Sequence, residues 1–172
     1  MPDPYQSLLT SAFRFMSVRS RSEKELVDFL QKKAQLKKFD VVFVEKVVLR
    51  MKELGYIDDK KFAESFLFSR SRGKPKGPQV IRQELKIKGI SEELIAETFS
   101  KNGDMLNEEE QIELGKKALG KKGERYKKLP ILECKRKVHD LLVRRGFTAG
   151  VTHRLVDDYC QKAYNKSQEF DL

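Results

Sequence analysis

One stretch of the sequence, residues 115–122, nearly matches the P-loop that binds nucleotide phosphates. Gly115 and Gly120 have the required spacing, and Lys121 follows the second glycine. A P-loop also needs Ser or Thr after the lysine, to hold magnesium, and a buried strand before the first glycine. Lys122 stands where the hydroxyl should be, and an acidic run precedes the stretch. We therefore expect no nucleotide and no other cofactor.

The cysteines and histidines do not form a metal-binding pattern. Cys134, Cys160, His139 and His153 show neither the C-x-x-C nor the H-x-x-x-H spacing that brings ligands together. Cys134 falls on an apolar helical stripe, where a thiol serves as a small hydrophobic side chain. The sequence predicts no metal site, and in a reducing compartment two unpaired thiols.

Two pairs of adjacent carboxylates could in principle perform acid–base chemistry. The pair at residues 58–59 stands at a predicted helix start, where capping explains it. In the pair at residues 157–158, Asp158 lies four residues before Lys162, the spacing of a surface ion pair. No pKa-shifting environment is visible around either pair. We predict that neither pair is catalytic, and we predict no other catalytic residues.

Charge is the most informative property of the composition. Lys and Arg total 36 against 26 Asp and Glu, a net charge of +10, which favours nucleic acid, an anionic membrane face or an acidic protein as partner. No run is long and apolar enough to span a bilayer, and the N-terminus lacks a signal-peptide pattern. We expect a cytoplasmic protein that does not bind membranes.

Basic residues cluster around predicted helix ends. Between residues 70 and 88 there are seven basic residues and one acid, Glu84. Such clusters suit contacts with phosphates, which carry affinity but little sequence information. A merely solvated basic surface is the alternative. The predicted binding residues are Arg70, Arg72, Lys74, Lys76, Arg82, Lys86, Lys121, Lys122, Arg125, Lys127, Lys128, Arg144 and Arg145.

Helices must position these side chains, since strand-like alternation is almost absent. The clearest joint is residues 54–63, where an apolar helical stripe ends, Gly55 can turn left-handed, and Asp58 or Asp59 can cap the next helix. Tyr56 and Ile57 are expected to pack between helical units. A second signal is the capping box at residues 22–25, and a basic loop of about ten residues is expected after residue 119.

A repeated phrase divides the chain into modules. Residues 84–91 align with residues 141–148: an apolar helix end, basic residues, a glycine, an apolar residue and a hydroxyl cap. The first module matches only the start of the phrase, with Lys33-Ala34 where the glycine should be. The sequence predicts an all-α fold, an elongated tandem array of three three-helix, helix-turn-helix-like repeats. Their predicted bounds are 1–57, 58–104 and 105–172, the last with the basic loop.

The phrase at residues 54–59, followed by Phe62 and Ala63, resembles the signature of the RecX family, regulators of the RecA recombinase. Residues 22–26 and 77–90 resemble it too, whereas the missing first-module glycine and the lysine-rich residues 120–128 depart from it. The resemblance implies a right-handed string of three-helix repeats that lies in the groove of the RecA–DNA filament. It implies restraint of RecA's ATPase, strand exchange and co-protease activity, with roles in recombination, repair and the SOS response. It also implies that the protein is not itself an enzyme.

The expected partners are therefore the RecA filament and single- and double-stranded DNA, bound without sequence specificity. Two other classes stay open. One is a stand-alone DNA-binding protein using a helix-turn-helix-like module, although Glu92 and Glu93 would place acids at the start of its recognition helix. The other is an enzyme that acts on nucleic acid.

Overall fold

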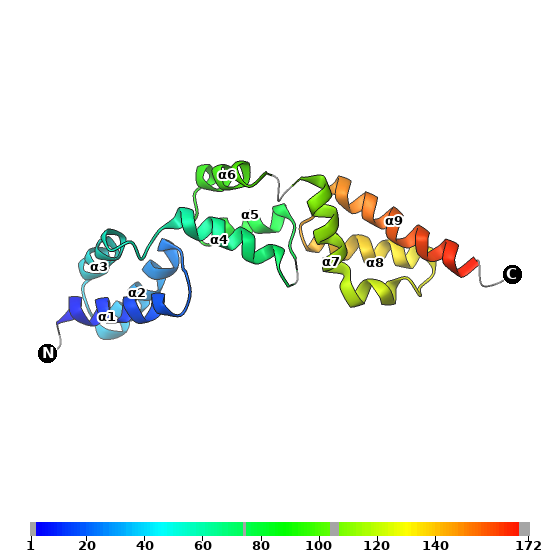
Figure 1. Cartoon of the computed structure of the whole chain (residues 1–172). Helices are drawn as coiled ribbons and strands as arrows, with labels where there is room; N and C mark the ends of the chain where they lie inside the picture. Colours follow the sequence, from blue (N-terminus) through cyan, green and yellow to red (C-terminus); the bar gives the residue numbers. More distant parts are fainter. Residues whose placement is uncertain (1–2, 74, 104–106, 169–172) are drawn as a thin grey trace. The chain divides into compact units, whose positions relative to one another are not determined.

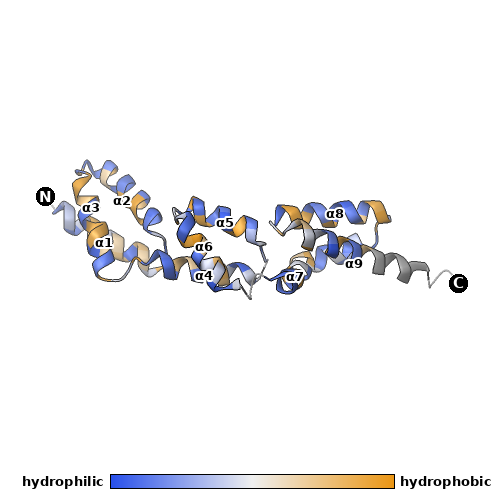
Figure 2. Ribbon diagram, turned by 90° about the horizontal axis from the view of Figure 1, so that it is seen from above, coloured by the Kyte–Doolittle hydropathy of each residue, from blue (hydrophilic) through white to orange (hydrophobic). Residues whose placement is uncertain are grey.

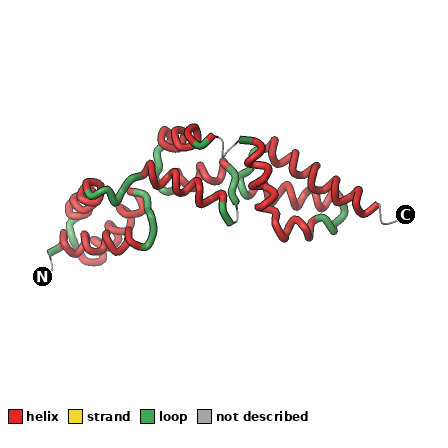
Figure 3. Tube along the Cα trace, in the orientation of Figure 1, coloured by secondary structure: helices red, strands yellow, loops and turns green. Residues whose placement is uncertain are grey.

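The computed structural model describes residues 3–73, 75–103 and 107–168. In these ranges the regular structure is helical throughout, without a strand (Figures 1 and 3), which confirms the predicted all-α fold. The helices are α1 (Pro4–Ser17), α2 (Glu23–Lys37), α3 (Val42–Glu53), α4 (Asp59–Ser71), α5 (Pro78–Ile87), α6 (Glu92–Lys101), α7 (Glu108–Tyr126), α8 (Ile131–Arg144) and α9 (Ala149–Gln168).

Short polar side chains fix where several helices begin. Ser22 and Glu25 form the predicted capping box at α2, so that two backbone N–H groups are satisfied reciprocally. The side-chain oxygens of Asn107 and Ser91 accept hydrogen bonds from the first turns of α7 and α6. Pro78 opens α5, where a missing N–H costs nothing. The capping box confirms the helix start expected from the sequence at residues 22–25.

The chain forms two compact units, Met1–Phe66 with Leu85–Thr98, and Leu67–Glu84 with Phe99–Leu172. Both are built from amphipathic helices, on which hydrophobic and hydrophilic residues alternate (Figure 2). In the first unit, one core cluster joins α1, α2 and α3 around Leu8, Leu26 and Val47, all 0% exposed. Burial of one such leucine contributes about 1.5–3 kcal/mol. The predicted repeat bounds of 1–57, 58–104 and 105–172 remain a prediction.

The core of the second unit lies between α7, α8 and α9. Leu119, Val138, Leu142 and Leu155 are at most 1% exposed. At Gly115 the backbone of α7 approaches α9 so closely that an added Cβ would lie 2.3 Å from Leu155 Cδ1. The two helices therefore pack with no room for a side chain at this position.

The joint predicted at residues 54–63 has the expected backbone. Gly55 has a φ of 73°, and Asp58 Oδ1 caps α4 by accepting from the N–H of Lys61. Ile57 is 8% exposed and belongs to the core of α1–α3. Tyr56 differs from the expectation, because it is 51% exposed and rests edge-on against the ring of Phe13, with centroids 5.1 Å apart.

The predicted basic loop after residue 119 is wrong. Only Gly120 departs from helical geometry, with φ 43° and ψ −138°, and the helix resumes at once and continues to Tyr126. Lysine, arginine and glutamate are good helix formers, so a lysine-rich run is not by itself a loop signal. Gly120 therefore bends α7 without ending it.

The segment predicted as the first module does contain the left-handed turn that the repeated pattern predicts. It lies at Lys38, with a φ of 56°, five residues beyond Lys33. The N–H of Phe39 donates to Ala34, just as the residues after Gly89 and Gly146 donate back into α5 and α8. The turn is the Schellman type, which usually requires glycine. Because a lysine fills the position and α2 is longer, the alignment of repeats by sequence missed it.

Candidate nucleic-acid interface

The end of α8 is fastened to the start of α5 within the second unit. The N–H of Gly77 donates to the carbonyl oxygen of Arg145 at 2.7 Å, and that of Gln79 donates to Gly146 at 3.2 Å. An added Cβ on Gly77 would lie 2.2 Å from the Gly146 oxygen. The free N–H groups of one helix start and the free carbonyls of another helix end thus satisfy each other.

Arg145, one of the predicted binding residues, belongs to this joint. Its Nη1 donates to the carbonyl oxygen of Pro75 at 3.2 Å, and its own carbonyl receives Gly77. Its neighbour Arg144 is exposed and donates from Nε to the Asp140 carbonyl at 3.1 Å. Arg145 therefore positions the segment before α5, whereas Arg144 presents charge at the surface.

Glu84 on α5 gathers two more predicted residues. Arg70 Nε donates to Glu84 Oε2 at 2.8 Å, and Lys76 Nζ pairs with Glu84 Oε1. Burial alone would raise the pKa of Glu84, but the hydrogen bonds from Lys76 and Arg70 outweigh it and lower the pKa. The three side chains are 24–34% exposed. The cluster carries a net charge of +1 and holds the chain between α4 and α5 in place.

The remaining residues of this region differ in their surroundings. Arg82 is half-buried, with its guanidinium 4.1 Å from the ring centroid of Phe99. Lys86, four residues later on α5, pairs with Glu92 at 2.7 Å with both side chains more than half exposed. Arg72 is exposed and makes no ion pair with a described residue. Lys74 lies outside the described residues.

The kinked end of α7 presents the least neutralised charge. Lys121, Lys122, Arg125 and Lys128 are exposed, and none of them forms an ion pair with the part of the chain that the structure describes. Lys127 is different, because its Nζ bonds Glu124 Oε1 at 2.8 Å. The structure thus brings together the four exposed cations of this cluster, which we call the α7 basic cluster.

Exposed lysines and arginines without acid partners are suited to phosphate contacts, and each neutralised phosphate releases counterions. Residue types and spacing alone did not show that Arg70 and Lys76 are ion-paired whereas the residues of the α7 basic cluster are not. A signal did exist, because Glu84 is the single acid among seven basic residues between positions 70 and 88. A lone acid in a basic run is a natural partner for its neighbours.

Lys88 is a charged residue whose role sequence reasoning missed. Its Nζ lies 2.8 Å from Glu25 Oε1, and the two side chains are 22% and 19% exposed. Burial would raise the pKa of Glu25, but hydrogen bonds from Arg19 and Lys88, and from the N–H of Ser22, outweigh it and lower the pKa to about 2. Lys88 therefore stabilises the first unit, 63 residues from its partner along the chain.

Other kinds of site receive no support within the described ranges. His, Cys, Asp and Glu do not gather there in threes around a possible metal position. No helix in those ranges combines the length and the apolar character needed to cross a membrane. The buried, free thiols of Cys134 and Cys160 both lie in the core of the second unit.

Comparison with known proteins agrees with this architecture. Residues 58–98 match the family model described as RecX, second three-helix domain. The chain is 33% identical over 170 residues to the regulatory protein RecX of Bacillus velezensis, covering 99% of this chain and 60% of that protein. It is 30% identical to the Geobacillus protein of the same name, covering 90% of this chain and 54% of that protein. The chain thus spans less than two thirds of these relatives.

Solved structures share the fold. A crystal structure of regulatory protein RecX superimposes with a TM-score of 0.73 at 28% identity, over 91% of this chain and 74% of that one. RecX from Lactobacillus salivarius gives a TM-score of 0.70 at 22% identity, over 92% and 98%. With the matching family model and relatives aligned over nearly the whole sequence, the chain belongs to the RecX family.

Proposed function

We propose that the chain binds the RecA–DNA filament and modulates, mostly by inhibition, RecA's ATPase, strand-exchange and co-protease activities. The observation that carries the proposal is the alignment of 99% of the chain with a protein named regulatory protein RecX. The proposed mode of action is binding rather than catalysis, so the chain itself should hydrolyse nothing. DNA and RecA are the proposed partners, in the cytoplasm, with no preference for DNA sequence.

The α7 basic cluster supports the DNA part of this proposal. Its four cations are exposed and without ion pairs among the described residues. Contacts from such residues to phosphates are independent of sequence, and they weaken as salt rises. In the filament, the same charges would bring the chain to the bound strand while other surfaces contact RecA.

The test is RecA-catalysed ATP hydrolysis on single-stranded DNA, with and without the protein at substoichiometric amounts. We expect slower hydrolysis and slower strand exchange, and no hydrolysis by the protein alone. Unchanged RecA rates at saturating protein, together with failure to co-sediment with RecA filaments, would refute the proposal. Co-sedimentation with unchanged rates would leave binding but remove the regulatory role.

The alternative of a sequence-specific helix-turn-helix protein is less well supported. Its recognition helix would be α6, whose first turn carries Glu92 and Glu93, both exposed. Residues at that position contact base edges in such proteins, and a carboxylate beside the phosphates is repelled. Footprinting on duplex DNA separates the two, since a defined protected sequence would favour the alternative.

A further inference from the structure

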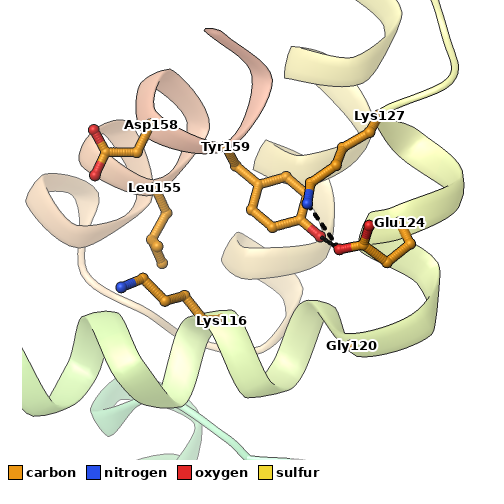
Figure 4. Close-up of a pocket in the computed structure, with 7 residues that line it drawn as sticks. All are labelled: Lys116, Gly120, Glu124, Lys127, Leu155, Asp158 and Tyr159. Carbon is orange, nitrogen blue, oxygen red and sulfur yellow. Dashed lines mark hydrogen bonds and ion pairs between the residues drawn. The ribbon is translucent and has the colours of Figure 1, made fainter. Parts of the chain in front are cut away.

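A pocket of about 430 Å³ opens between α7 and α9 in the second unit (Figure 4). Its floor is Leu155, which is 1% exposed, and one wall carries the ring of Tyr159. Charged side chains lie at its edges. The lining residues are Lys116, Gly120, Glu124 and Lys127 from α7 and its C-cap, and Leu155, Asp158 and Tyr159 from α9. The pocket therefore combines an apolar interior with hydrogen-bonding groups around the mouth.

Tyr159 is fixed in its orientation. Its hydroxyl donates to Glu124 Oε1 at 2.8 Å, and Lys127 Nζ bonds the same oxygen while lying 4.3 Å from the centroid of the tyrosine ring. An added Cβ on Gly123 would lie 2.4 Å from the tyrosine hydroxyl, so the α7 backbone also holds the ring from its edge. Burial and the bond to Glu124 both raise the pKa of Tyr159, so the phenol stays neutral.

Cations border the pocket along its α7 wall. Each lining residue from α7 is followed directly in the chain by an exposed basic residue: Lys116 by Lys117, Gly120 by Lys121, Glu124 by Arg125 and Lys127 by Lys128. Lys117 precedes the bend of α7 at Gly120, and the other three residues follow it, so cations neighbour the lining residues on both sides of the bend. None of these four pairs with an acid among the described residues.

We propose that this pocket receives one base of single-stranded DNA while Lys117, Lys121, Arg125 and Lys128 beside it hold the neighbouring phosphates. Binding of single strands typically combines a positive track for the backbone with an apolar or aromatic surface for bases. Here the pocket lies between α7 and α9, and the cations follow its α7 lining residues directly in the chain. The carboxylate of Asp158 suits the amino groups at base edges, and it would repel an acidic peptide. For the choice of DNA as ligand, this inference rests on the proposed function.

The test compares two short fluorescent strands of equal length and charge, one with bases and one abasic, by anisotropy without RecA. The wild-type protein should bind the strand with bases more tightly, by roughly fivefold to a hundredfold, the range for stacking of one base. Asp158→Leu places an apolar side chain at the pocket mouth and should abolish this preference. Asp157→Leu makes the same charge change on the preceding residue of α9, outside the lining. It also releases Lys135, the ion-pair partner of Asp157, and it should keep the preference.

A second variant separates base recognition from phosphate binding. Replacing Lys121 and Arg125 together by glutamine should weaken binding of both strands alike. The log–log salt dependence should become shallower by roughly 0.7 for each phosphate that is no longer neutralised. The preference for bases should survive in that variant. Circular dichroism melts, equal for all variants, exclude unfolding as the cause.

Equal affinity of the wild-type protein for both strands would overturn the proposal. So would a preference that Asp158→Leu leaves intact. If Asp158→Leu spares DNA binding but weakens binding to RecA filaments, the pocket takes a protein side chain instead. Because DNA binding is measured without RecA, failure of the regulatory function would leave these results interpretable.

Discussion

The backbone N–H of Gly77 donates to the carbonyl oxygen of Arg145 across 2.7 Å, so the segment before α5 and the end of α8 meet backbone to backbone. Two glycines allow this approach. A Cβ on Gly77 would collide with the Gly146 carbonyl, and a Cβ on Gly146 would lie 2.5 Å from the nitrogen of Val80. Gly146 also has a φ of 79°, in the left-handed region. The joint thus depends on the absence of side chains.

The first prediction concerns this joint. Gly146→Ala should lower the free energy of unfolding by at least about 2 kcal/mol, because a left-handed alanine costs about 1–2 kcal/mol before any clash is counted. Gly150→Ala is the matched control, since Gly150 lies on α9 and has open space where its Cβ would be. That change should be neutral or stabilise the helix by up to about 1 kcal/mol. Urea unfolding measures both, and equal effects would contradict the role of the joint.

The second prediction concerns Glu84. Glu84→Gln removes the common partner of Arg70 and Lys76, and should destabilise the protein by roughly 1 kcal/mol because the pairs are only partly exposed. It also releases two cations from that carboxylate, so binding to single-stranded DNA should tighten. The log–log salt slope should steepen by roughly 0.7 for each additional phosphate that is neutralised. Glu53→Gln, which removes the partner of the exposed Arg50, is the control for added charge alone.

If Glu84→Gln binds DNA no more tightly than Glu53→Gln, Arg70 and Lys76 serve only to hold the segment before α5. Fluorescence anisotropy over a range of salt concentrations distinguishes these outcomes.

The third prediction is a pH dependence centred on Glu25. Its pKa of about 2 in the folded protein lies below its ordinary value of 4.5, so the ion pairs with Arg19 and Lys88 stabilise the folded state fully above pH 4.5. This contribution, on the order of 2–3 kcal/mol, should be lost as the pH falls from about 4.5 to about 2. The Glu25→Gln variant should not show this loss of stability as the pH falls. Parallel acid-unfolding curves for both proteins would contradict the assignment.

The fourth prediction concerns the joint at residues 54–63. Ile57→Asp buries a charge without a partner in the core of α1–α3, and should destabilise by about 3 kcal/mol or more. Tyr56→Ser should cost much less, because Tyr56 is half exposed and contacts the ring of Phe13 only at its edge. Thermal melts rank the two variants. The reverse order would place the buried wedge at Tyr56.

Helix starts could be predicted well, because caps act over three or four residues. The box at Ser22 and the turn at Gly55 are both local signals, and the structure confirms them. The end of α7 could not be predicted in the same way. Gly120 and a lysine run look like a break, but the residues after Gly120 are helix formers, and the bent α7 packs on α9 through Gly123 and Tyr159.

The candidate interface was harder to predict than the fold. Basic residues are visible in a sequence, but their partners are not. Glu84 lies 14 residues from Arg70 and 8 from Lys76, and Arg145 bonds a carbonyl 70 residues away. Which charges remain available is therefore decided by tertiary contacts. The division of the predicted residues into paired and unpaired sets needed the structure.

The joint between α8 and α5 also makes hydrogen exchange a reporter of cooperativity. The amide protons of Gly77 and Gln79 are bonded to carbonyls beyond α8 and not within their own helix. They can exchange only when that joint opens, even if α5 itself stays helical. Their exchange rates should therefore follow the opening of the contact with residues 145–146, which are distant in the sequence. Two segments of the second unit that lie far apart in the sequence are thus thermodynamically coupled through individual peptide groups.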